Sequence, residues 1–273
     1  NPRWGDTEIW AAIQREGRRF TPAYFVSAID MRYAADGSIE RQPENQRIYV
    51  TLFIRTLMLS VAITLTTLLL GYPIAYLLAT LPLRYSNLLM ICVLLPFWTS
   101  LLVRTTAWIV LLQQQGVLND ILVALGILSD DGRIMMVYNA TGTIVAMTHI
   151  LLPFMVLPLY SVMKGIPPSY VRAARSLGAN PWTAFWKVYV PQTIPGVGAG
   201  AVLVFIISIG YYITPALVGG QSGQMISNLI AFHMQNSLNW GLAAALGTIL
   251  LGGVMILYWV YNRIVGVDNV KLG

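Results

Sequence analysis

This sequence is poor in charge and in the residues that usually build catalytic or metal sites. Only 10% of its 273 residues are charged, whereas a soluble domain carries roughly a quarter. It has two histidines and one cysteine, Cys92, so a disulfide within the chain is excluded and no zinc-ligand cluster is expected. Because Cys92 lies in an apolar run, we interpret it as a small core or lipid-facing residue.

Motifs for nucleotide hydrolysis and nucleic-acid binding are missing as well. Gly219-Gly220 is not followed by a Lys-Ser/Thr pair, so we interpret it as a turn rather than a phosphate-binding loop. The net charge of +6 is not gathered into a basic stripe with interleaved aromatics, which argues against nucleic acid as a partner. We therefore predict that the chain is not an enzyme and holds no metal or cofactor of its own.

Long hydrophobic runs are what the sequence has in abundance. Hydrophobic residues make up 56% of it and the mean hydropathy is +0.65. Runs that can cross about 30 Å of hydrocarbon predict membrane-spanning helices. We predict five spans, at about 52–80, 87–112, 143–163, 194–217 and 241–262. The predicted fold class is all-α, a polytopic helical bundle in contact with membrane lipid, with its transmembrane domain at 51–264.

The loop at 164–193 is basic and contains no acidic residue. Basic loops face the cytoplasm in inner-membrane proteins, so we expect this loop and a short tail at 265–273 to be cytoplasmic. The loops at 113–142 and 218–240 then fall outside, where we expect a surface or re-entrant helix at 225–236. A lone histidine on that helix, His233, is more often solvated than a ligand.

The first 50 residues differ from the rest because they hold half of the charged residues. By the alternation of the loops, residues 1–50 are external and follow a further span, giving six spans in the full protein. Their aromatic residues, such as Trp4 and Trp10, suggest an ordered external cap.

The segment after the third span carries two helix-sized pieces with a glycine between them. Pro168 suits the first turn of a helix, and Gly178 can take the left-handed conformation that ends one. Asn180 and Pro181 then read as the cap and first residue of a second helix, which Pro191 is expected to close. One apolar face of the first helix is predicted from an i, i+3, i+4, i+7 spacing, with Tyr170, Ala173, Ala174 and Leu177.

Small residues and prolines mark the predicted spans. Gly196 with Gly200, and Ala243 with Gly247, are pairs at a spacing of four that favour close helix approach. Prolines also interrupt the apolar runs, where each removes a backbone hydrogen bond, at Pro73, Pro96, Pro153 and Pro158.

Arg104 is the only charged residue deep within a predicted span, where a charge costs roughly 2.5–3.5 kcal/mol on insertion scales. We interpret it either as paired in a functional site or as reaching toward the interface. Aromatic residues in the outer half of the spans either line a substrate pathway or belong to interfacial belts: Trp98, Trp108, Tyr160, Tyr211 and Tyr212.

The segment 172–191 resembles the cytoplasmic coupling loop of ABC importer permeases. The family's pattern is Glu-Ala-Ala, a glycine four residues on, then aliphatic–any–aliphatic–Pro. The residues that fit are Ala173, Ala174, Gly178, Val188, Val190 and Pro191. Arg172 stands where the family has Glu. The stretches at 96–104, 116–120, 152–160 and 215–220, with Asn239-Trp240, look like those of spermidine/putrescine-type permeases.

The resemblance implies a type I ABC importer permease in a bacterial inner membrane. It implies one half of a heterodimeric pathway, with a second permease subunit, a homodimeric ATPase that holds ATP and Mg²⁺, and a periplasmic substrate-binding protein. Residues 170–178 and Pro191 would couple to the ATPase, and the aromatic residues above and Arg104 would face substrate, most simply a polyamine.

Several alternatives remain open at this point. Related permeases carry opines, phosphonates and other small organic solutes, and Tyr211-Tyr212 stands where polyamine permeases often have an acid. A proton- or sodium-coupled transporter is disfavoured because no acidic residue lies in a span. A non-transporting membrane scaffold would show the same hydropathy without a coupling loop.

Overall fold

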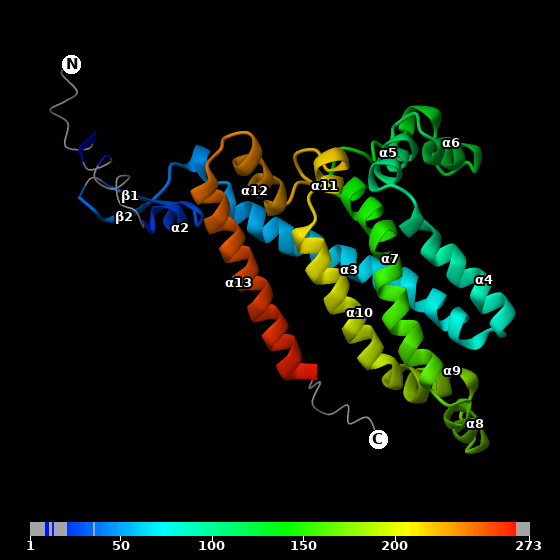
Figure 1. Ribbon diagram of the computed structural model, residues 1–273. Coiled ribbons are helices and arrows are strands. Elements are labelled where there is room, and N and C mark those ends of the chain that lie inside the picture. Colours follow the sequence, from blue (N-terminus) through cyan, green and yellow to red (C-terminus); the bar gives the residue numbers. More distant parts are fainter. Residues whose placement is uncertain (1–8, 11–12, 14–20, 35, 266–273) are drawn as a thin grey trace. The chain divides into compact units, whose positions relative to one another are not determined.

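The computed structural model describes residues 9–10, 13, 21–34 and 36–265 (Figure 1). Helices dominate it, as the apolar runs predict. The longer helices are α3 (Tyr49–Thr80), α4 (Leu83–Leu94), α5 (Leu101–Leu112), α7 (Ala140–Gly165), α10 (Val190–Gly210), α12 (Ile226–Gln235) and α13 (Trp240–Val265). The shorter elements are α2 (Ala23–Ser27), β1 (Met31–Tyr33), β2 (Ile39–Arg41), η2 (Glu44–Gln46), η3 (Leu95–Trp98), α6 (Val117–Ala124), η4 (Asp130–Gly132), α8 (Pro168–Ser176), α9 (Pro181–Ala184), η5 (Phe185–Tyr189) and α11 (Ile213–Val218).

Five helical segments of the described chain are long and apolar enough to cross a membrane. Three of them, α3, α7 and α13, match the predicted spans 52–80, 143–163 and 241–262 within three residues at each end. The helix expected at 225–236 is α12. Most of the predicted tail 265–273 lies outside the described residues, as does Trp4.

The predicted span 87–112 is not one helix, and this prediction needs correction. Helix α4 gives way to the 3₁₀ turn η3, and Thr99 and Ser100 are extended before α5 begins. Pro96 explains the break because it lacks an N–H and clashes with the preceding turn. The segment long enough to span is instead Leu101–Ala124, which contains α5 and α6.

The predicted span 194–217 is displaced toward the N-terminus. A continuous helical run extends from Pro181 to Gly210 through α9, η5 and α10. Tyr211 is extended and the short helix α11 follows. Pro191 therefore does not close a helix, as expected from the sequence, but lies in the first turn of α10. The π-helical turn η5 directly before it is a common way to accommodate a break in the hydrogen-bond ladder.

The described chain divides into two compact units. One holds the described residues up to Leu57 together with Met225–Ile256, and the other holds Met58–Gln224 together with the described residues from Leu257 onward. In the first unit, a two-stranded antiparallel hairpin pairs Met31 with Arg41. The hydrophobic core of this first unit contains the buried residues Ala28, Tyr49, Ile226, Leu242, Ala245 and Leu246. The part of segment 1–50 that the structure describes is thus ordered.

Asp30 caps the first long helix from a distance in sequence. Its Oδ1 accepts from the backbone N–H groups of Ile48 (3.1 Å) and Tyr49 (3.0 Å), and its Oδ2 accepts from Val50 (2.9 Å). Asp30 is buried and has φ +60°, a conformation that Asp tolerates better than most residues. A carboxylate at a helix N-terminus satisfies free N–H groups and opposes the helix dipole.

Helix α7 is the centre of the second unit, with α10 as its principal partner (Figure 1). Gly196 lies against Leu159 and Val162, and a Cβ on Gly200 would lie 2.8 Å from the Met155 sulfur. The predicted close approach at this glycine pair is confirmed. At Gly247 an added Cβ meets nothing within 4 Å, whereas Ala243, the other member of the second pair, is buried.

Candidate functional site

The termini of α8 are built by local signals that the sequence predicts. Pro168 occupies the first turn. At the other end, the Gly178 N–H donates to the Arg175 carbonyl and the Ala179 N–H to the Ala174 carbonyl, both at 3.0 Å. These two bonds form a Schellman motif, and Gly178 has φ +90°, where a side chain is strained.

The helix after Gly178 starts as predicted. The Asn180 side chain accepts from the Thr183 N–H at 2.7 Å, and Pro181 follows in the first turn. The turn between α8 and α9 is therefore fixed by residues within five positions of one another. The hydrogen bonds of this turn are therefore local, whatever α8 contacts elsewhere.

The apolar face predicted on α8 is divided in the structure. Ala174 is half-buried, whereas Tyr170, Ala173 and Leu177 are exposed, Leu177 to 90%. The side chain that turns inward with Ala174 is Val171, which the predicted face omitted. The spacing identified a helix correctly but not which side of it meets the protein.

Large apolar side chains therefore gather on the surface of the segment from α8 to η5. Tyr170 and Leu177 are joined by Trp182, 71% exposed, and by Trp186. The Trp182 and Trp186 rings are in contact, with centroids 5.6 Å apart. Exposed apolar patches of this kind mark interaction sites.

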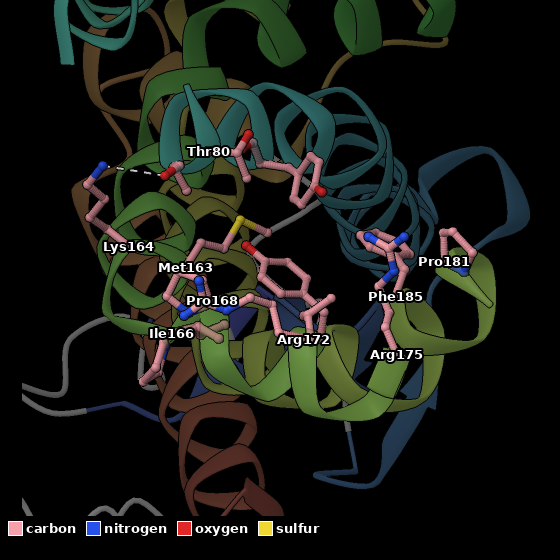
Figure 2. Close-up of a pocket in the computed structure, with 14 residues that line it drawn as sticks. Thr80, Met163, Lys164, Ile166, Pro168, Arg172, Arg175, Pro181 and Phe185 are labelled. Carbon is pink, nitrogen blue, oxygen red and sulfur yellow. Dashed lines mark hydrogen bonds between the residues drawn. The ribbon is translucent and has the colours of Figure 1, made fainter. Parts of the chain in front are cut away.

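Behind α8 lies a cavity of about 700 Å³. Its walls come from the ends of α3 and α7, from the inner side of α8 and from the start of the α9–η5 run. Figure 2 shows Lys164 on one side and Arg172 and Arg175 on the α8 side. The Lys164 ammonium donates to the Ala79 carbonyl at 3.4 Å. Arg172, which replaces the acid of the family pattern, thus lines a basic cavity.

Arg104 and all five of these aromatic residues were predicted to face substrate, and His149 brings some of them together. The Trp108 Nε1–H donates to His149 Nδ1 at 3.2 Å. Arg104 lies within electrostatic range of both His149 and Tyr211. The Arg104 Nε is buried and has no hydrogen-bond partner in the described chain. Arg104 is therefore half-buried beside polar groups rather than simply directed to the interface.

Among the described residues, Trp98 and Tyr160 form no hydrogen bond or ring contact with this cluster. Trp98 is 89% exposed at the end of η3. Tyr212 occupies the N-cap position of α11, without a side-chain capping bond, and is exposed. The sequence analysis did not identify His149 as a site residue. Its position within the predicted span 143–163 was an available signal, because the chain has only two histidines.

His233 differs from the solvated residue that was expected. It is buried, its Nε2 lies 3.3 Å from the Tyr49 hydroxyl and its Nδ1 lies 2.8 Å from Ser237 Oγ. Burial lowers the pKa of His233, because the charged imidazolium is disfavoured away from water. In the part of the chain that the structure describes, no group of three potential metal ligands occurs.

The loop 113–142, which was expected on the outer side, is stabilised by polar contacts of Asn119 and Arg133. Asn119 is fully buried and exchanges hydrogen bonds with the backbone of Ile134, at 2.8 and 3.1 Å. The Arg133 guanidinium pairs with Asp120 at 2.7 Å and Asp130 at 2.8 Å. These carboxylates raise the pKa of Arg133.

Comparison with known proteins finds one family and several close relatives. The family described as binding-protein-dependent transport system inner membrane component matches residues 71–265. The spermidine/putrescine transport system permease protein PotB of Salmonella typhimurium (strain SL1344) is 34% identical over 220 residues, which cover 80% of this chain and 76% of that protein. PotB of Haemophilus influenzae is 35% identical over 220 residues, with the same shares covered.

Solved structures share the fold. A bacterial alginate ABC transporter, in complex with an alginate pentasaccharide-bound periplasmic protein, aligns with 100% of this chain and 89% of its own, at a TM-score of 0.63 and 18% identity. The helical bundle predicted from the sequence is therefore the bundle of ABC importer permeases.

Proposed function

The chain belongs to the family of binding-protein-dependent transport system inner membrane components, and we propose that it forms half of the pathway by which an ATP-driven importer takes up a polyamine. It is a permease of the inner membrane. A second permease subunit forms the other half, a periplasmic protein delivers putrescine or spermidine, and a separate ATPase drives the cycle. The observation that carries the substrate assignment is the 34% identity to PotB over 80% of the chain.

The coupling role is proposed for the segment from Tyr170 to Pro191. A rigid local turn at Gly178 holds α8, and exposed apolar side chains such as Leu177 and Trp182 surround it. This is the surface on which the ATPase would dock, so that closure of the ATPase dimer moves α8 and the ends of α3 and α7 beside it. Domain movements of this kind link nucleotide binding to alternating access.

Uptake of labelled putrescine and spermidine tests the substrate. Cells that lack their own polyamine import, and that express the complete transporter, should take up both compounds, and cells without this subunit should not. Normal assembly of the complex with no uptake of either polyamine would overturn the substrate while leaving the permease role intact.

Retention of the ATPase tests the docking surface. Replacing Leu177 with Asp places a charge in the apolar patch, and burial of a leucine is worth about 1.5–3 kcal/mol, so ATPase retention on purification should fall about tenfold or more. Leu125→Asp is the matched control because Leu125 is also well exposed but lies at the end of α6. Equal retention by the two variants would count against docking on α8.

A second candidate substrate is a small solute that carries a carboxylate. The observation that favours it is Arg104, whose Nε lacks a partner and which lies near His149. A guanidinium binds a carboxylate strongly, and it repels a polycation. If Arg104→Gln lowers transport, the solute is an anion or zwitterion bound there, and if Arg104→Gln leaves polyamine uptake intact, Arg104 lies off the pathway.

A further inference from the structure

The basic cavity behind α8 has a ligand chemistry that ATPase coupling does not explain. Three basic residues line this cavity of about 700 Å³: Lys164, Arg172 and Arg175. Within the described residues, no carboxylate lies at ion-pair distance from any of them. The sequence offers none nearby, since no acidic residue occurs between Asp131 and Asp268. Three uncompensated cations around a cavity fit an anion.

A buried hydroxyl supplies a second, independent observation. Tyr189 lines the same cavity and is only 7% exposed, and its hydroxyl has no hydrogen-bond partner in the described chain. The ring is held in place by Tyr76, with centroids 5.3 Å apart, and by Phe185 at 5.7 Å. Buried hydroxyl groups are normally hydrogen-bonded, so a ligand oxygen in this cavity would satisfy a group that the protein leaves unsatisfied.

A second, apolar groove is lined by neighbouring residues of the same helices. It has a volume of about 770 Å³ and is lined chiefly by Leu65, Leu69, Tyr72, Trp186, Val190 and Val197. On α3, Leu65, Leu69, Tyr72 and Tyr76 follow at spacings of four, three and four, so they share one helix face. Tyr76 belongs to the cavity and Tyr72 to the groove.

Residues of η5 and the start of α10 are likewise divided between the cavity and the groove. Phe185 and Tyr189 line the cavity, and the residues that follow each of them, Trp186 and Val190, line the groove. A charged site with an apolar groove lined by neighbouring residues, on a membrane protein, matches an amphipathic anion. We propose that cavity and groove together bind one acidic phospholipid, with its phosphate among Lys164, Arg172 and Arg175 and an acyl chain along α3.

The chemistry favours a phosphodiester headgroup over other occupants. Guanidinium groups bind phosphate oxygens through paired hydrogen bonds, and basic pockets between membrane helices accept anionic headgroups. A free phosphate would use the cavity but not the groove. An acidic side chain of the ATPase would also leave the groove empty. A bound lipid would brace α8 against the ends of α3 and α7, which goes beyond the proposed coupling role.

Lipid retention by the purified, complete transporter tests this proposal. After exchange into detergent, native mass spectrometry is recorded with dioleoyl phosphatidylglycerol or dioleoyl phosphatidylcholine added. We expect phosphatidylglycerol to stay bound and phosphatidylcholine to be lost. Equal retention of both lipids, or displacement of phosphatidylglycerol by inorganic phosphate at similar concentration, would overturn the proposal.

Charge variants locate the site. Lys164→Gln and Arg175→Gln should each weaken phosphatidylglycerol retention about fivefold, as expected for one basic residue facing an anionic headgroup. Lys187→Gln is the matched control, since Lys187 is an exposed cation on η5 that does not line the cavity. If the first two variants lose the ATPase but keep the lipid, the cavity receives the ATPase instead and the lipid proposal is wrong. Loss of the lipid in Lys164→Gln, a position outside the coupling segment, with the ATPase and polyamine uptake retained, would separate the two proposals.

Discussion

Two helix ends in this chain are organised in opposite ways. At the α8–α9 turn the hydrogen bonds that form the turn join residues at most five positions apart, through Gly178, Ala179 and Asn180. At the start of α3 the cap comes from Asp30, eighteen or more positions earlier in the chain. The first arrangement leaves its outer surface exposed, with Leu177 and Trp182 open to a partner. The second buries its polar group inside a core.

Local and long-range contacts at a helix end are expected to serve different purposes in the transporter. A turn formed by local hydrogen bonds can keep its conformation while its contacts with a partner protein change during a transport cycle. A cap that reaches across the chain ties the beginning of a span to the segment before it, and should matter chiefly for stability. Substitutions at the two helix ends should therefore separate transport from folding.

The largest effect is expected at Gly178. In Gly178→Val a β-branched residue must occupy φ +90°, and the left-handed conformation costs about 1–2 kcal/mol, a factor of about 5–30. Because α8 would be displaced from its docking angle, we expect ATP-dependent uptake to fall at least about tenfold in proteoliposomes containing the complete transporter.

Gly126→Val provides the control for this substitution. Gly126 also has positive φ, +70°, and open space around it, but it follows α6 rather than α8. It should show similar backbone strain with nearly unchanged uptake. A similar loss of uptake in both variants would show that strain in general, and not the position of α8, limits transport.

The next largest effect concerns the remote cap of α3. Asp30→Asn removes the charge and leaves only one oxygen for three backbone N–H donors. Losing a charged cap of this kind should lower the free energy of unfolding by about 1–2 kcal/mol. Thermal unfolding of the purified protein, with hydrogen exchange at Ile48–Val50, measures it.

Asp36→Asn is the matched control, because Asp36 is exposed and accepts from the neighbouring Ser38. Those hydrogen bonds lower the pKa of Asp36, but its position on the surface predicts a change too small to shift the melting temperature clearly. If Asp30→Asn is no less stable than Asp36→Asn, the three bonds to Asp30 do not hold the start of α3.

A smaller effect is expected when the local cap of α9 is removed. Asn180→Ala deletes the acceptor of the Thr183 N–H, a loss of about 0.5–1 kcal/mol for an exposed cap. Uptake should fall by a few fold, with little change in melting temperature. Asn139→Ala, which removes the equivalent bond to Gly142 at the start of α7, should not impair coupling, and an equal loss of uptake there would contradict the special role of the α8–α9 turn.

The contrast between the two helix ends also explains what the sequence could predict. Pro168, Gly178, Asn180 and Pro181 act on their immediate neighbours, so residue type and spacing were sufficient for α8 and α9. The break at Thr99 and the continuous run through Pro191 depend on how a proline is accommodated, by a 3₁₀ turn in one case and a π-helical turn in the other. Spacing alone does not distinguish these outcomes.

The long-range polar contacts lay beyond local patterns altogether. Asp30, His149 and His233 each find their partner through the packing of separate elements. Helical periodicity placed Tyr170 and Leu177 on one face of α8, but the packing of Val171 toward the cavity decided which side is buried. The sequence thus predicts the span count and the geometry of the α8–α9 turn, whereas the polar cluster around His149 required the structure.

The smallest predicted effect is a pH dependence of the unit that contains His233. Burial holds the pKa of His233 below its usual value, so the unfolded chain takes up a proton before the folded protein does. This contribution to stability is therefore complete above the ordinary histidine pKa of about 6.5 and declines as the pH falls below it. Thermal unfolding between neutral and mildly acidic pH should show the decline.

His233→Gln should flatten this pH dependence, because glutamine can still hydrogen-bond near Tyr49 and Ser237 but does not titrate. Arg84→Gln serves as a control for the loss of a polar side chain, since Arg84 is exposed on α4. An unchanged slope in His233→Gln would assign the pH dependence to other groups. A flattened slope, with uptake unaffected, would place His233 with Asp30 among the contacts that stabilise the chain, and apart from the α8–α9 turn, for which we propose a role in coupling.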